Sequence, residues 1–537
     1  MTGTTMPETL ICNATIVDGS GAPPHPGEIL VRADTIAGLG PNGRFQRCGR
    51  RLIDAGEMIV SPGFIDVHSH ADNAALLDYA DASKISQGVT TEVVGNCGMS
   101  LFPIDPDHSP DTVALLEQTF PRLAWDWRTY AEFSSRVTDR GVVTNQAQLL
   151  GHNTLRTSVG ANGATLRPQQ QEAMRARLTE ALNDGATGLS TGLIYAPGAY
   201  SSFDELADLL GHLPATAMYA SHMRNESYGL LESIEEIIAL ARQSGARCHV
   251  SHLKASGYSN WGKVGDALAL LDRARTDGLA IKQDIYPYTA SSTMLTALLP
   301  PAFREGSPEE LLDRLGTPEE LERLKGDLES ANPNWESPIH ESGWSSITIA
   351  SAASGHVEGH RLDSIARDRE TDPVTTLRDL LVENGLRITM IQESMDEADI
   401  VSALRNDHTM IGSDGLPPGL GGKPHPRQWG TFPRIIGRYS REKQILPMTE
   451  AVRRMTSLPA EWFGITNRGA IRTGMKADLC AFDYESINDT ATYDAPESKA
   501  DGMHWVMVNG TIAYADREVI GLAGQLLKKT YPPHHEG

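Results

Sequence analysis

The sequence predicts an α/β protein: a (β/α)8 TIM-like barrel with a small β-sandwich domain formed by the N- and C-terminal segments. Two observations favour this fold. The middle of the chain alternates short apolar runs with helical patterns, and both ends carry short strand patterns separated by Gly, Pro and Asn. Repeated strand–helix units indicate a parallel sheet, because each helix carries the chain back before the next strand begins.

The apolar runs of the middle region number about eight, the count that closes a barrel. They are separated by helical patterns such as QEAMRARLTEALNDG and LLESIEEIIALARQSG. The predicted strands lie near residues 60–67, 90–95, 146–151, 186–190, 217–221, 247–251, 279–286 and 408–413. We expect functional side chains after the C-terminal ends of these strands, since barrel chemistry is placed on that face.

The predicted domains are a discontinuous sandwich, residues 1–61 with 468–537, and a barrel, residues 62–467. The two ends are expected to pair, because short exposed strands are marginal until a second layer covers them. Residues 300–400 form an insertion between strands seven and eight, rich in Pro, Glu and Arg. This insertion is either a lid over the catalytic face or a peripheral helical decoration.

The composition is that of an ordinary globular protein, with 40% hydrophobic and 22% charged residues. A formal net charge of −22 argues against nucleic acid or an anionic membrane as a partner, because both require a basic surface. The five cysteines are far apart and form no CxxC pair, which favours a reducing compartment. With no leader-like opening and no long apolar run, the protein is expected in the cytoplasm.

The strongest local motif is His68-Ser69-His70, which directly follows the apolar run MIVSPGFIDV. Residues i and i+2 of an extended strand point to the same side, so both imidazoles can face one metal ion. Taken alone, an HxH motif is more often a pair of surface or turn histidines. Its importance therefore depends on whether other ligands accompany it.

Four further candidate ligands follow other predicted strands. Cys97 lies between glycines in VVGNCGMS, and a thiolate binds zinc well, although a free cysteine often only packs as a small hydrophobic residue. His222 and His252 share the pattern S-H-x-[RK], thirty residues apart. Asp414, in MIGSDGLPPG, could form an Asx turn or carry protons to and from a metal-activated water.

These side chains fall at the ends of the first, second, fifth, sixth and eighth predicted strands. Such ends converge in a closed barrel, whereas in an open sheet they would not. Nitrogen, sulfur and oxygen ligands favour zinc over magnesium and leave manganese, iron and cobalt open. The sequence therefore predicts a metal site made by His68, His70, Cys97, His222, His252 and Asp414.

The segments SPGFIDVHSH, QGVTTEVVGNCG, DIYPYTASST, GSDG and HPRQWGTFPR, with the two Ser-His motifs, resemble the amidohydrolase superfamily, specifically its N-acyl-D-amino-acid deacylases (D-aminoacylases). The resemblance spans nearly the whole chain. It implies a tight zinc site at Cys97, His222 and His252, a weaker second site at His68 and His70, and Asp414 as catalytic acid and base. It also implies substrate contacts from Tyr195, Lys254, Tyr286, Ser292 and Arg427.

In this resemblance Arg427 and Lys254 would meet the free carboxylate of the substrate, and Tyr195 could polarise its carbonyl. The chain also departs from related patterns at two places. GATGLSTGLIYAPG lacks the lysine with which hydantoinases and dihydroorotases bridge two metals, so the bridging role would pass to Cys97, which argues against a cyclic-imide hydrolase. The spacer GLPPGLGGKPHP before Arg427 has extra glycine and no Asp, which leaves substrate choice open.

The expected function is zinc-dependent hydrolysis of N-acyl-D-amino acids to a carboxylate and a free D-amino acid, with metal-activated water and Asp414 as base and acid. The alternatives are a dipeptidase or another amidase acting on a related substrate, such as a natural product or an L-configured amide. A deaminase that uses Glu226, or a metal-stabilised binding scaffold, is a further alternative. Acyl and side-chain preference, metal occupancy and oligomeric state are not determined by the sequence.

Overall fold

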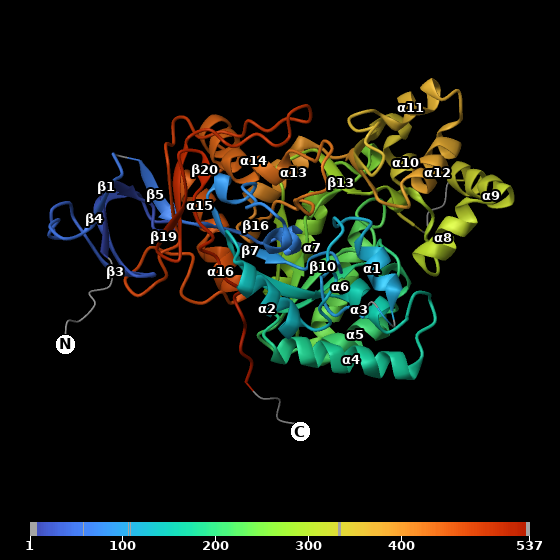
Figure 1. The fold of residues 1–537 in the computed structure, drawn as a ribbon, viewed down its shortest axis with the longest axis horizontal. Helices are drawn as coiled ribbons and strands as arrows, with labels where there is room; N and C mark the ends of the chain where they lie inside the picture. The colour runs from blue at the N-terminus through green and yellow to red at the C-terminus, as the bar shows by residue number, and fades with distance from the viewer. Residues whose placement is uncertain (1–7, 57, 106, 108, 331–334, 533–537) are drawn as a thin grey trace.

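Figure 1 shows the computed structural model, which describes residues 8–56, 58–105, 107, 109–330 and 335–532. A barrel, a sheet domain beside it and a helical insertion make up this part of the chain. The ends of the predicted sandwich (1–7 and 533–537) and a piece of the predicted insertion (331–334) lie outside the described residues.

The barrel is an eight-stranded parallel sheet in the order β16-β12-β11-β10-β9-β8-β7-β6. Its strands are β6 (Phe64–Asp66), β7 (Val89–Val94), β8 (Asn145–Gly151), β9 (Gly188–Gly192), β10 (Met218–His222), β11 (Arg247–Val250), β12 (Ile281–Ile285) and β16 (Thr409–Ile411). Just beyond the edge strands, the Asp414 N–H donates to the His68 carbonyl at 2.7 Å and the His70 N–H donates to the Gly415 carbonyl at 3.0 Å. These bonds join the two edges, and the predicted barrel is confirmed.

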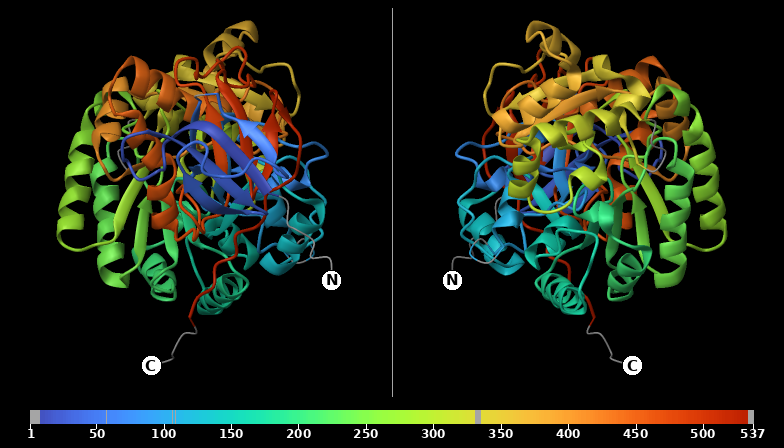
Figure 2. Two further views of the ribbon diagram at one scale, coloured as in Figure 1. Left: turned by 90° about the vertical axis from the view of Figure 1, so that its left-hand side faces the viewer. Right: turned by 90° about the vertical axis from the view of Figure 1, so that its right-hand side faces the viewer.

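The two chain ends form one nine-stranded sheet in the order β20-β19-β18-β17-β5-β1-β2-β3, with β4 paired to β1. Its strands are β1 (Glu8–Ile16), β2 (His25–Arg32), β3 (Thr35–Gly40), β4 (Arg51–Asp54), β5 (Ile59–Pro62), β17 (Leu479–Phe482), β18 (Met503–Val508), β19 (Thr511–Ala515) and β20 (Glu518–Val519). Figure 2 shows the blue N-terminal and red C-terminal strands side by side. Their buried core draws on both ends, as predicted, through residues such as Ile11, Ile29, Val60, Leu479 and Met507.

The first predicted strand, 60–67, is divided between the two sheets. β5 pairs with β1 and β17, whereas β6 begins the barrel beside β7. The division falls at Gly63, where an added Cβ would lie 2.1 Å from a side-chain atom of Thr90. Both halves are fully buried, so their apolar pattern is continuous and cannot reveal the change of sheet.

The last described segment also differs from the predicted sandwich. Backbone N–H groups of Gly524 and Leu527 donate to the carbonyls of Val142 and Gln146 at 2.8 and 2.7 Å. This part of the predicted sandwich segment 468–537 therefore lies against the barrel. A short strand-like pattern does not indicate which of two nearby sheets it will join.

Helices cover the outside of the barrel strands. In α6, buried Leu230, Ile234, Ile237 and Ala241 recur at intervals of three or four, the spacing of one helical face. The helices outside the insertion are α1 (Pro110–Leu116), α2 (Tyr130–Arg140), α3 (His152–Ser158), α4 (Pro168–Asn183), α5 (Phe203–Gly211), α6 (Leu230–Ser244), α7 (Lys263–Thr276), α13 (Glu397–Arg405), α14 (Arg427–Arg434), α15 (Met448–Met455) and α16 (Ser457–Phe463). Within the described residues, none of the helices combines the length and apolar character that a bilayer span needs.

The insertion between β12 and β16 has its own small sheet. Antiparallel strands β13 (Ala290–Met294), β15 (Ile388–Glu393) and β14 (Ile347–Ala352) pair in that order. Its helices are α8 (Pro308–Leu315), α9 (Pro318–Glu329), α10 (Pro338–Ser342), α11 (Leu362–Asp368) and α12 (Pro373–Glu383). In Figure 1 these helices lie at the end of the molecule opposite the terminal sheet.

Asp478, next to β17, ties the terminal sheet to the barrel. Its carboxylate is 4% exposed, pairs with Arg468, and accepts hydrogen bonds from the Asn509 N–H at 2.6 Å and from Asn145 Nδ2, on β8, at 3.2 Å. Because a buried guanidinium that loses its partner is strongly destabilising, this carboxylate couples the stability of the two units.

We expect Asp478→Ala to lower the free energy of unfolding by about 3–5 kcal/mol, because Arg468 would stay buried without a counter-ion. Urea denaturation measures the change. The matched control is Asp494→Ala, at an exposed position, for which a change within about 0.5 kcal/mol is expected. Equal stability of both variants would contradict the structural role of Asp478.

Candidate metal centre

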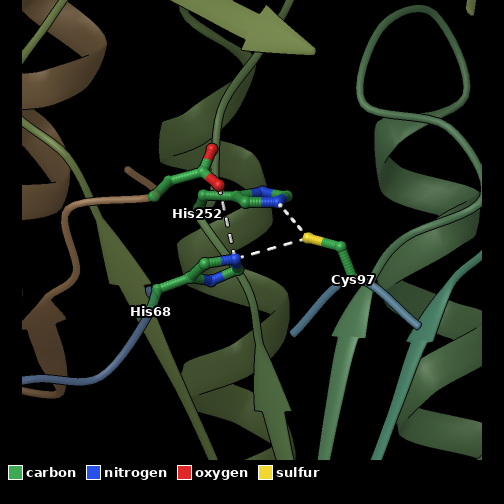
Figure 3. A group of neighbouring side chains, drawn as sticks. His68, Cys97 and His252 are labelled. Carbon is green, nitrogen blue, oxygen red and sulfur yellow. Dashed lines mark hydrogen bonds and ion pairs between the residues drawn. The ribbon is translucent and has the colours of Figure 1, made fainter. Parts of the chain in front are cut away.

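The six predicted ligands meet at the C-terminal mouth of the barrel, and all are buried: His68, His70, Cys97, His222, His252 and Asp414. The Sγ atom of Cys97 lies 3.3 Å from His68 Nε2, 3.4 Å from His252 Nε2 and 3.7 Å from His222 Nδ1. Figure 3 shows His68, Cys97 and His252 pointing toward one another from separate strand ends. The convergence expected of a closed barrel is therefore present.

These separations fit a tetrahedral zinc ion. With zinc–sulfur and zinc–nitrogen bonds of about 2.3 and 2.0–2.1 Å, sulfur and nitrogen ligands stand roughly 3.5 Å apart. The ligand atoms of His68, Cys97, His252 and Asp414 all lie within 4.8 Å of one another, and a second such group joins His222, Glu226 and His252. The donor set could hold one metal ion and offers neighbouring ligands for a second.

The backbone is strained where these ligands stand. Cys97, His252 and Asp414 have φ values of 51°, 36° and 50°, in a region that residues other than glycine seldom adopt. Gly95 has φ 79°, and a Cβ there would lie 2.1 Å from the Leu149 carbonyl oxygen. The glycine lets the chain turn tightly against β8 and bring the thiol inward. Strain of this kind persists where the surrounding structure holds it, typically at functional sites.

Two buried carboxylates stand behind the histidines. Glu226 lies 3.3 Å from His222 Nε2 and 2.9 Å from His252 Nδ1, and Asp284 lies 3.6 Å from His68 Nδ1. Carboxylates in this position fix the ring orientation of metal-binding histidines. Burial opposes ionisation of Glu226, but His222 and Lys254 lower its pKa to about 2.

The thiol and the catalytic carboxyl candidate are both held in their charged forms. Burial opposes ionisation of Cys97, but the neighbouring His68 and His252 hold the pKa of its thiol well below the usual value. The thiolate is the form that binds metal. Burial likewise opposes ionisation of Asp414, and Arg427 and His252 hold its pKa well below the usual range.

Asp414 stands at the centre of a short polar network. Its Oδ1 lies 3.2 Å from His70 Nε2 and 3.5 Å from His68 Nε2, and its Oδ2 lies 2.9 Å from an Arg427 nitrogen. One carboxylate thus connects the HxH motif with the HPR motif. Because it is charged and beside the metal-competent atoms, it can accept a proton there.

A cavity of about 180 Å³ opens onto this cluster. His222, Glu226 and Asp414 line it, together with four of the five predicted substrate contacts: Tyr195, Lys254, Tyr286 and Ser292. Its size and mixed lining suit a small polar molecule.

Several cavity residues are already engaged. The Tyr195 hydroxyl is 2.9 Å from Thr293 Oγ1, and the Ser292 hydroxyl donates to the Met390 carbonyl at 2.8 Å. Lys254 Nζ lies 2.6 Å from a Glu226 oxygen. A substrate would therefore meet oriented groups rather than mobile ones.

Arg427 is the predicted contact that the structure does not place on the cavity wall. Its guanidinium stacks on the Tyr286 ring at 4.4 Å, pairs with Asp414, and donates to the Ser292 carbonyl at 3.0 Å. In this arrangement it contacts the proposed acid–base group rather than open space. Its backbone N–H donates to His425 Nδ1 at 3.0 Å, so the HPR motif holds its own arginine in place.

Sequence reasoning gave no role to Asp284 or His425 and considered Glu226 only as a deaminase acid. Asp284 and His425 stand in segments that carried the family resemblance, DIYPYTASST and HPRQWGTFPR, and Glu226 follows the first of the two Ser-His motifs. Their position in or next to these segments was the sequence signal that could have marked them as functional residues. The contacts of Asp284 with His68 and of Glu226 with His252 join residues distant in the chain, so spacing could not reveal them.

A β/α barrel with buried histidine, cysteine and aspartate side chains that could hold a metal ion at its C-terminal mouth is the arrangement of a metal-dependent hydrolase. The chain belongs to the amidohydrolase family, whose sequence profile matches residues 51–315 and 370–514.

Known proteins resemble the chain over nearly its full length. D-aminoacylase of Alcaligenes xylosoxydans xylosoxydans is 33% identical over 528 residues, covering 97% of this chain and 98% of that protein. A solved D-aminoacylase structure, described by one-metal activation and second-metal attenuation of a binuclear centre, is 31% identical with a TM-score of 0.81, covering 97% of this chain and 99% of that one.

A second solved structure adds a bound ligand. The N-acyl-D-glutamate deacylase of Bordetella bronchiseptica, complexed with zinc and a phosphonate mimic of the tetrahedral intermediate, is 34% identical with a TM-score of 0.80. The match covers 98% of this chain and 100% of that one. The similarity therefore includes both the barrel and the terminal sheet.

Proposed function

We propose that this protein is a zinc-dependent hydrolase that cleaves the amide bond of N-acyl-D-amino acids to a carboxylate and a free D-amino acid. The observation that carries the proposal is the convergence of Cys97, two histidines and Asp414 beside a small polar cavity. Full-length similarity to D-aminoacylase supports the substrate class.

Cys97, His222 and His252 would hold the tight zinc ion. Support comes from the sulfur–nitrogen separations and from Glu226, which stands behind both histidine rings. His68 and His70, next to Asp414, would form the weaker second site. The two-metal description of the D-aminoacylase relative agrees with unequal sites.

A bound zinc ion would supply a Lewis acid that polarises the amide carbonyl and acidifies water. Asp414 accepts the proton of the attacking water at its carboxylate and returns it to the leaving amine nitrogen. Arg427 and His70 hold that carboxylate in place through contacts at 2.9 and 3.2 Å. These contacts keep the group charged until it takes the proton.

The cavity residues would orient the substrate. Lys254 and Tyr286, with Arg427 behind the ring, would meet the free carboxylate, and Ser292 would contact the same end. The Tyr195 hydroxyl would polarise the carbonyl beside the metal.

The proposed insertion, 300–400, would act as a lid. This lid role is supported by the residues of the insertion that line the cavity, which include Pro301, Trp335, Glu336 and Gln392. The proposed domain limits are 1–61 with 468–537 for the sandwich and 62–467 for the barrel, with the part around Gly524 and Leu527 lying against the barrel. The five free cysteines support a reducing compartment, the cytoplasm, as the location.

Stereochemically paired substrates test the function. We expect zinc-loaded protein to release amino acid from N-acetyl-D-leucine, N-acetyl-D-glutamate or other D-configured members of a panel. Release from the L-enantiomers should be at least about 100-fold slower, because a fixed carboxylate site and a fixed metal can position only one enantiomer for attack. Amine release is measured together with zinc content. Equal rates on both enantiomers, or ammonia release without carboxylate, would contradict the proposal.

Asp414→Asn isolates the proton transfer. We expect turnover to fall by about a hundred- to ten-thousand-fold while the tight zinc stays bound, because the amide cannot accept a proton but Cys97, His222 and His252 are unchanged. Rates and zinc content are measured on the same preparation. Activity like that of the wild type would refute the assigned role, and so would loss of the tight zinc.

Cys97→Ala isolates the thiolate ligand. We expect zinc affinity to fall by more than about 100-fold, because changes behind the ligands alone already cost about 10- to 100-fold. Zinc is measured by competition with a chelating dye. Cys48→Ala, at the exposed cysteine, is the matched control and should bind zinc as the wild type does. If both variants retained tight zinc, Cys97 would not be a ligand.

A further inference from the structure

Gln87 is a buried glutamine that stands outside both the metal centre and the cavity wall. It ends a short 3-10 turn, Ile85–Gln87, and Gly88 then leads the chain into β7 with φ 91°. Because the side chain has no access to solvent, its amide must find hydrogen-bond partners within the protein. Those partners connect it to the proposed acid–base group.

The amide of Gln87 bonds to the first two turns of helix α14. Its Nε2 donates to the Gln428 carbonyl at 2.7 Å, and its Oε1 accepts the Phe432 N–H at 3.2 Å. These two backbone groups are four residues apart, the pair that an α-helix ordinarily joins to one another. Nε2 also donates to the Ser83 carbonyl at 2.7 Å, beside its own turn. One side chain thus fixes the start of α14 against the turn before β7.

Arg427 is the first residue of α14, so the position of that helix decides where its side chain can reach. The guanidinium is buried and stacks on the Tyr286 ring at 4.4 Å. Its Nη2 lies 2.9 Å from an Asp414 oxygen and donates to the Ser292 carbonyl at 3.0 Å. Nε and Nη1 have no hydrogen-bond partner among the described residues. With a single nitrogen engaged, the ion pair with Asp414 depends on where the helix begins.

The same turn holds the backbone of the other partner in this ion pair. Lys84, which is also buried, donates to the Asp66 carboxylate at 2.9 Å and to the Ser413 hydroxyl. The second Asp66 oxygen accepts the Ser413 N–H at 2.8 Å. Because Ser413 directly precedes Asp414, the turn before β7 connects the two segments whose charged side chains meet.

The three segments also pack closely where they meet. A Cβ added at Gly415 would lie 2.7 Å from Lys84 Nζ and 3.3 Å from the Gln428 Cα. The turn before β7, the turn after β16 and the start of α14 are therefore in direct contact. A shift of α14 at this junction would change the distance between Arg427 and Asp414.

We propose that Gln87 is a positioning residue for the proposed reaction: its amide sets the start of α14 so that Arg427 meets the Asp414 carboxylate. The inference rests on the proposed function, in which Asp414 moves a proton between the attacking water and the leaving amine. A displacement of about 1 Å in a reacting group can cost about 100-fold in rate. Gln87 does not line the cavity, so it acts through this ion pair.

Gln87→Met removes the three hydrogen bonds of the amide and keeps the length of the side chain. We expect kcat on the best substrate of the D-configured panel to fall by about 10- to 100-fold, with KM within about threefold of the wild-type value. The reason is that Asp414 is displaced while the side chains that line the cavity stay in place. Steady-state rates and bound zinc are measured on one preparation, and the zinc content should not change.

Gln170→Met is the matched control. Gln170, on α4 outside the barrel, is also buried and donates to two backbone carbonyls, those of Val159 and Gly160, at 3.2 and 2.8 Å. It accepts one backbone N–H, that of Arg167, at 3.0 Å. The same loss of hydrogen bonds should lower stability comparably and leave kcat within about twofold. An equal fall of kcat in both variants, or no fall in Gln87→Met, would overturn the positioning role.

Gln87→Asn is the second variant and serves if Gln87→Met does not fold. Its amide is one methylene shorter, so it stays polar but cannot reach both groups of α14. We expect kcat to fall in the same way, with KM and zinc content unchanged. A kcat equal to that of the wild type would count against the proposal as it would for Gln87→Met.

Crystal structures of the variants separate this inference from the proposed function, because they require no turnover. In the Gln87 variants we expect the distance between Arg427 Nη2 and Asp414 Oδ2 to increase from 2.9 Å to beyond about 3.5 Å, outside hydrogen-bond range, whereas Gln170→Met should keep it. If the wild type hydrolyses no amide but this distance responds, the function fails and the positioning of the ion pair stands. If the enzyme is active and the distance does not respond, the function stands and the positioning role is wrong.

Discussion

The buried thiolate of Cys97 is the interaction on which the rest of the site depends. A negative sulfur inside a barrel mouth must be met by positive charge or by hydrogen-bond donors, and here the ring nitrogens of three histidines lie within 3.7 Å of it. To bring the sulfur there, the chain adopts a left-handed backbone at Cys97 and turns at Gly95. The strain is held by packing against β8.

Charges of alternating sign extend outward from that sulfur. Glu226 stands behind two of the histidine rings and is itself paired with Lys254, while Asp414 is paired with Arg427. Lys254 and Arg427 help to hold the carboxylates of Glu226 and Asp414 in their charged forms, which explains how these ionisable side chains remain buried together. The hydrogen bond from the Asp414 N–H to the His68 carbonyl also joins the barrel edges, so the contact that closes the barrel also sets Asp414 beside His68.

The candidate metal ligands and part of the cavity wall come from different parts of the chain. The metal-competent ligands follow barrel strands, whereas Arg304 and Glu336 come from the insertion between β12 and β16. A change in the insertion can therefore alter the cavity wall without moving the candidate ligands. The barrel supplies the rigid part of the site, as expected for this fold, and the added segment supplies the variable wall.

The sequence by itself determined the eight barrel strands, the pairing of the chain ends and the six candidate ligands, because strand periodicity and ligand motifs are local features. Only the tertiary structure decided that residues 60–67 divide between two sheets at Gly63, since both halves are equally buried. It also decided that Arg427 faces Asp414 and that Arg304 has no carboxylate partner within the described part of the chain. Partners of charged side chains are chosen by contacts between distant segments, and spacing along the chain carries no record of those contacts.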